Sequence, residues 1–92
     1  MDREVARTLI NQELRRLKES PYRELLKLLD KTSTTMLEGP DGVTYQMETQ
    51  AFWDSKAGGN IRVMVSVDDG RFFSAVKPLT GDFIISPDGS FL

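Results

Sequence analysis

The chain has 92 residues, enough for one domain (residues 1–92) with a single modest core. Its 12 basic and 14 acidic residues give a net charge of −2, and its 39% hydrophobic residues are typical of a folded globular protein. Neither cysteine nor histidine is present, which excludes disulfides, thiol and histidine chemistry, and the usual zinc, haem and iron–sulfur sites.

A first helix is predicted over residues 2–19. Its apolar residues fall on about half of the helical circumference at 100° per residue; they are Val5, Ala6, Leu9, Ile10, Leu14 and Leu17. Glu13 falls inside this apolar arc. It is either a partly buried functional carboxylate or a residue at a seam that pairs with Arg16, and we favour the second interpretation because unpaired buried charge is rare.

A second helix is predicted over residues 21–31. Ser20 is a favoured N-cap residue and Pro21 suits the first helical position, so we expect a break between the helices and a capping bond from Ser20. The helix has an apolar stripe at helical spacing, formed by Tyr22, Leu25, Leu26 and Leu29.

A basic row lies on the opposite side of this second helix, formed by Arg23, Lys27 and Lys31. It could bind phosphate, but Glu24 and Asp30 interrupt it. We interpret it as a solvated helix face and do not expect nucleic acid as a partner.

Residues 32–92 are predicted to form the sheet. A strand over residues 32–37 and a turn at Gly39-Pro40-Asp41-Gly42 lead into the longest alternating pattern, residues 43–54 and 61–67 around Gly58-Gly59. A symmetric loop places Trp53 opposite Ile61 and the apolar side chains of both strands on one face. We therefore expect an antiparallel hairpin with Trp53 as a core anchor.

The C-terminal third is predicted to continue as a meander. Asp69-Gly70 indicates a hairpin turn into a strand over residues 72–76. Thr80-Gly81-Asp82 is interpreted as another turn, followed by a strand over residues 83–86 and a return over residues 90–92. The expected fold class is α+β, with two N-terminal helices on one face of an antiparallel meander of four to five strands.

No catalytic or nucleotide-binding motif occurs in the chain, so an enzyme is not favoured and no cofactor or metal is expected. Carboxylates could still bind a hard cation or form an acid–base pair; the candidates are Asp54, Asp68, Asp69, Asp82 and Asp88. All five are interpreted as turn residues, where aspartate bonds to its own backbone.

The candidate binding site is the outward sheet face. Phe52 should lie opposite Arg62, and Gln50 opposite Met64, with Phe73 (or Phe72, if the turn is longer) beside them. Aromatic residues, methionine and arginine are enriched at the cores of protein interfaces. The alternative is that the C-terminal segment, with Ile84 or Phe91, folds over this face.

We therefore predict a small protein-binding or self-associating module, of an adaptor, immunity or antitoxin kind, using the outer face of its sheet with a protein partner or a second copy. The alternatives are a carboxylate-dependent enzyme and a weak nucleic-acid binder. A signal peptide and a membrane span are not recognised, so we expect no membrane association and a cytoplasmic location.

Overall fold

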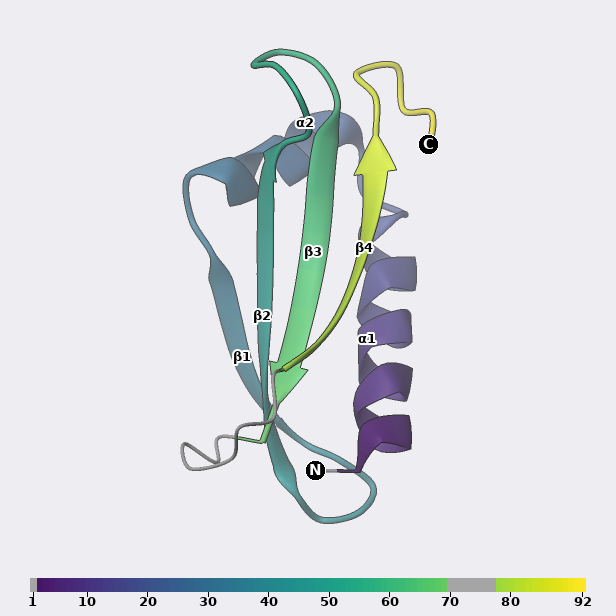
Figure 1. Ribbon diagram of the computed structural model, residues 1–92, viewed down its shortest axis with the longest axis vertical. Coiled ribbons are helices and arrows are strands. Elements are labelled where there is room, and N and C mark those ends of the chain that lie inside the picture. The colour runs from purple at the N-terminus through teal and green to yellow at the C-terminus, as the bar shows by residue number, and fades with distance from the viewer. Residues whose placement is uncertain (1, 70–77) are drawn as a thin grey trace.

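The computed structural model describes residues 2–69 and 78–92 and has the predicted α+β arrangement, with helices packed on one side of a four-stranded antiparallel sheet (Figure 1). The strands follow the chain in the order β1-β2-β3-β4. The elements are α1 (Arg3–Leu17), α2 (Tyr22–Leu25), the 3-10 helix η1 (Leu26–Leu29), β1 (Ser33–Glu38), β2 (Thr44–Trp53), β3 (Ile61–Asp68) and β4 (Leu79–Ile85).

Helix α1 begins one residue after the predicted start, with Asp2 as its N-cap, and ends at Leu17 rather than residue 19. The Asp2 side chain accepts hydrogen bonds from the backbone N–H groups of Glu4 and Val5, which satisfies two of the unpaired donors of the first turn. The helix turns its apolar arc to the sheet. Glu13 forms an ion pair with Arg16, which confirms the interpretation that we favoured for it.

The second helical segment is shorter than predicted. It comprises one turn of α-helix and one of 3-10 helix, ending at Leu29 rather than residue 31. The break before it is confirmed, but Ser20 is not its N-cap: Pro21 takes that position without a side-chain bond. The Ser20 N–H instead donates to the Leu17 carbonyl and closes the last turn of α1.

The hairpins follow the predicted register. Trp53 pairs with Ile61, and Met47 pairs with Val67 at the other end of the β2–β3 pair. The β1–β2 turn closes with a Gly42 N–H to Gly39 carbonyl bond, and Gly42 has the positive φ of 77° that glycine accepts readily.

The prediction of a turn at Thr80-Gly81-Asp82 is wrong, because these residues lie inside β4. Gly81 pairs with Val65, and a Cβ built on it would lie 2.7 Å from Ile10 and 2.9 Å from Leu14. The glycine is therefore needed for close approach of α1 to the strand and makes no turn. The strand predicted over residues 72–76 falls outside the described residues.

The core lies between α1, α2, η1 and the inner face of the sheet. Its largest fully buried side chain is Tyr45, and Ile10 and the inward apolar side chains of β3 are also fully buried. Trp53 lies on the predicted face, but it is only half-buried at the margin of this core. The prediction of its inward face is therefore confirmed, but the prediction of Trp53 as the anchor of the core is wrong, because it packs against the core without being fully buried.

Candidate functional site: the outer face of the sheet

The outer face is the side of the sheet turned away from the helices, and the strand register places its side chains in rows. Phe52, Arg62 and Ile84 form one row across β2, β3 and β4. Gln50, Met64 and Asp82 form the next row. The pairings of Phe52 with Arg62 and of Gln50 with Met64 are as predicted.

The apolar side chains of these rows lie in a small group with Phe52 as its most exposed member. Phe52 is 41% exposed, and Met64 and Ile84 are half-buried beside it. We call the three the apolar cluster. Isolated apolar residues are common on surfaces, but three neighbours around one arginine stem form a continuous contact area.

The C-terminal segment does not cover this cluster in the way considered from the sequence. Ile84 belongs to the outer face itself, since it lies in β4 opposite Arg62. Phe91 packs edge-on against Phe83, with ring centroids 5.7 Å apart, and Phe83 belongs to the buried inner face. The amino group of Lys18 lies 5.5 Å from the centre of the Phe91 ring, so the C-terminal return is held on the side of α1.

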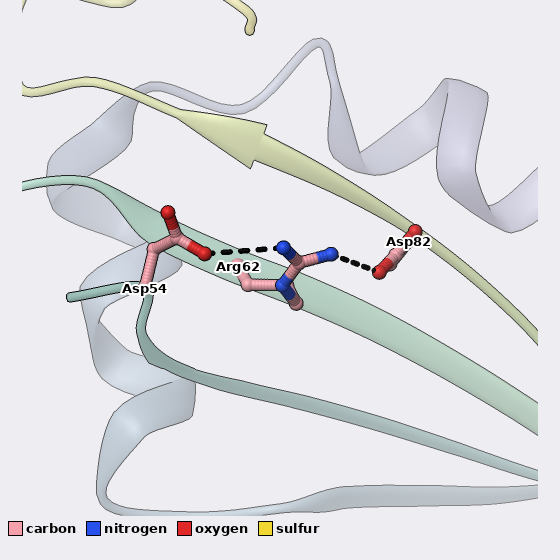
Figure 2. A network of polar contacts seen from close by, with 3 residues as sticks. All are labelled: Asp54, Arg62 and Asp82. Atoms are coloured by element: carbon pink, nitrogen blue, oxygen red, sulfur yellow. Dashed lines mark hydrogen bonds and ion pairs between the residues drawn. The ribbon is translucent and has the colours of Figure 1, made fainter.

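Arg62 is fixed between two carboxylates on either side of its strand (Figure 2). Its Nη1 donates to Asp82 at 2.5 Å and its Nη2 donates to Asp54 at 3.1 Å. These bonds, the one to Asp82 first, raise the pKa of Arg62 above its already high usual value. The guanidinium is one-third exposed and stays charged, so it is an ordered group at the surface.

The described part of the outer face is acidic. Its strands carry four acidic residues besides Asp54, which follows β2; the four are Glu38, Glu48, Asp68 and Asp82. Arg62 is the basic residue of this face in the described part of the chain, so five negative charges against one positive give a net charge of −4. Such a face attracts cationic surfaces and repels a copy of itself.

The sequence analysis did not assign three residues to this face and named one that lies outside the described residues. Asp82 was interpreted as a turn residue because the strand was predicted to begin at Phe83, and Ile84 was considered only as a residue that could fold over the face. Met36, 61% exposed, also lies on the outer face at the far corner, opposite Gln46; its alternation with the inward Leu37 was the available signal. Phe73 falls outside the described residues.

The arrangement gives little support to the alternative functions. Asp54 and Asp82 come together only through Arg62, and Asp54 and Asp68 lie at opposite ends of the β2–β3 hairpin, as expected. Within residues 2–69 and 78–92 no cluster of three acidic residues could hold a metal ion. In the basic row, Lys27 pairs with Glu24 at 2.9 Å.

In the described part of the chain, no helix has both the length and the apolar character needed to cross a membrane. No protein-family model, curated protein or solved structure matches the sequence or the fold.

Proposed function

We propose that the chain is a protein-binding module whose outer sheet face receives a partner with an apolar centre and a basic rim. The observation that carries the proposal is the apolar cluster around Arg62, set in a face whose described residues carry a net charge of −4. Interface cores combine aromatic residues, methionine and arginine with a polar rim, and this face has that composition.

Charge decides between a different protein and a second copy at this face. Two outer faces packed together would bring two acidic surfaces into contact, and opposed like charges cost several kcal/mol. A partner with lysine or arginine around an apolar group avoids that cost. We therefore assign this face to a different protein, with the Arg62 stem packed among the apolar cluster and its guanidinium held in place by two aspartates.

Site-specific photo-crosslinking tests the proposal directly. A benzoylphenylalanine replaces Phe52 in one variant and Phe91 in a matched control, because the two rings are similarly exposed, at 41% and 47%, on different sides of the molecule. The expected result in cells of the source organism is a cross-linked protein from position 52 and none at position 91, with basic residues next to the cross-linked peptide.

The captured protein is then purified and its affinity measured against wild type and against Phe52→Asp with Met64→Asp. We expect the double substitution to weaken binding at least tenfold, because it places charge in the centre of the contact. Cross-links that are equal at positions 52 and 91, or an affinity that the double variant leaves unchanged in a folded protein, would overturn the proposal.

A further inference from the structure

The outward edge of β1 is a row of backbone groups without a partner among the described residues. The Gly39 N–H donates to the Val43 carbonyl, and hydrogen-bonded pairs alternate along an antiparallel ladder. With the observed register, Thr35 and Leu37 therefore direct their backbone groups at β2. Thr34 and Met36 direct theirs at the open edge, and Glu38 continues the row.

Among residues 2–69 and 78–92, none of the usual protections of a sheet edge is found on this strand. Natural edges are blunted by proline, lysine, bulges or a covering segment. The sequence of β1 is Ser-Thr-Thr-Met-Leu-Glu, paired with β2 without interruption. Its residues are exposed on both faces apart from Leu37, which is half-buried, and the helices pack mainly on the other three strands.

We propose that β1 pairs with β1 of a second copy of this chain, joining the two sheets into one. A twofold axis through Thr35 makes the strands antiparallel, pairs residues 33–37 of the two copies and keeps their inner faces on the same side. It sets Thr34 opposite Met36 of the second copy. Each of the two residues can then donate its backbone N–H to the backbone carbonyl of the other. Ser33 lies opposite Leu37 on the inner face by the same symmetry.

Charge and space both favour this occupant. Glu38 is the single charged residue of β1, and the antiparallel arrangement places the two copies of it at opposite ends of the new pair. Strands in a sheet are about 4.8 Å apart, so the β2 strands of the two copies would be about 14 Å apart. The helix that packs over β2 in each copy is η1. Because a helix is about 10 Å in diameter, the two copies of η1 fit side by side without collision.

This inference does not rest on the proposed partner of the outer face, because the edge and the face use different groups. Two chains joined along β1 keep both outer faces on the same side and uncovered. Substitution of Phe52 and Met64 should therefore leave the dimer intact. Thr34→Pro, which changes neither the apolar cluster nor a charged residue of the outer face, should leave the outer-face affinity of each protomer unchanged.

A matched pair of proline variants tests the pairing. Thr34 and Thr80 are each the second residue of an edge strand, and the ladder directs the N–H of each away from the sheet. Proline removes that donor and leaves the bonds to the neighbouring strand in place. Thr34→Pro removes the bond from the Thr34 N–H to the Met36 carbonyl of the second copy, and symmetry removes the matching bond from the other chain. Thr80→Pro removes a donor on the opposite edge of the sheet, which is not part of the proposed pair.

Solution mass measured by sedimentation from about 1 µM to about 1 mM gives the dissociation constant. A single strand pair is smaller than a standard interface, so we expect a dimer of 10.4 kDa chains that forms only at the upper concentrations. Thr34→Pro should raise the dissociation constant at least tenfold, and Thr80→Pro should change it less than twofold. A wild type that stays monomeric at about 1 mM, or equal effects of both variants, would overturn the proposal.

Residue-resolved amide exchange of the wild type keeps the test independent of variant folding. At low concentration the amides of Thr34 and Met36 should exchange fast and those of Thr35 and Leu37 slowly. Raising the concentration should slow exchange at Thr34 and Met36 selectively. Dimerisation without that change would place the interface elsewhere and overturn the pairing.

Discussion

β4 and β1 both end the sheet, yet their outward backbone groups have different surroundings. On β4, Arg7 donates to the Thr80 carbonyl at 3.0 Å, and the Leu92 N–H donates to the Ile84 carbonyl at 3.0 Å. The Ser86 N–H donates to Ser90 in the same return of the chain. Among the described residues, Asp82 is the one outward-directed residue of β4 whose backbone has no such bond. In the same part of the chain, no backbone or side-chain group covers the outward edge of β1.

The two edges also differ in how much of the chain packs against them. α1 lies along β4 and β3, and Gly81 lets it approach the β4 backbone (Figure 1). The C-terminal return adds Phe91 against Phe83 and Lys18. β1 depends mainly on its ladder with β2 and on the turn that joins them. A covered edge cannot accept another strand, so the difference assigns any strand addition to β1.

The largest expected effect comes from removing a side chain under each edge. Ile10 is fully buried beneath β3 and β4, so Ile10→Ala should lower the free energy of unfolding by about 2–5 kcal/mol. Leu37 is half-buried on β1, so Leu37→Ala should cost about 1 kcal/mol or less. Urea unfolding of both variants measures the contrast, and equal losses would contradict the packing difference between the edges.

A methyl group at Gly81 should have the next largest effect. Gly81→Ala places a Cβ where Ile10 and Leu14 already lie, and such overpacking costs about 1–3 kcal/mol. Ile10→Ala opens that space, so the same glycine substitution should cost less in the Ile10→Ala background. A double-mutant cycle by urea unfolding measures the coupling. Strictly additive losses would show that α1 does not rest on the β4 backbone.

Removing the C-terminal cover should have a smaller effect, confined to β4. Phe91→Ala removes the edge-on contact with Phe83 and the Lys18 contact, together worth about 1 kcal/mol. The Ser86 amide, which donates to Ser90, should then exchange faster, with the amides of Val63 and Val65 unchanged. Unchanged exchange at Ser86 would mean that the return is held by its backbone alone.

The parts of the fold that were predictable are those fixed by local pattern. The alternation of β2 and β3 gave the register, because a one-residue slip would turn Val63 and its neighbours outward. Gly42 also behaves as predicted, with positive φ in a turn. Gly81 was misread because its sequence neighbours resemble a turn, whereas its reason is the distant contact with Ile10.

The part of the candidate site that lies on β2 and β3 was also predictable from local pattern. Phe52, Gln50, Arg62 and Met64 follow from one hairpin register. The fixation of Arg62 by Asp82 depends on the pairing of β3 with a strand about twenty residues later in the chain, which local periodicity does not reveal. Ser20 is not the cap because Pro21 takes the N-cap position, which leaves Ser20 one residue before it, and the Ser-Pro pattern alone did not fix the helix start to one residue.

The smallest expected effect is a pH dependence on the β1 side of the sheet. The turn before β2 is held by Asp41, which accepts a bond from the Tyr45 hydroxyl at 2.6 Å and another from the Val43 N–H at 3.2 Å. The bond from Tyr45 is the main cause that lowers the pKa of Asp41, and the same bond raises the pKa of Tyr45. The carboxylate form is therefore favoured in the folded state.

A lowered folded pKa means that this stabilisation is fully present above the usual aspartate pKa of about 4 and is lost as pH falls through the folded value. The raised Tyr45 pKa has the opposite sign, with stabilisation lost above about pH 10. Tyr45→Phe should lower the melting temperature at neutral pH, and its difference from wild type should narrow in acid. Tyr22→Phe is the control, because the Tyr22 hydroxyl donates at 2.7 Å to the Gly59 carbonyl, which does not titrate. If the loss of melting temperature in Tyr45→Phe is as independent of pH as the loss in Tyr22→Phe, the charge of Asp41 does not stabilise the turn next to β1.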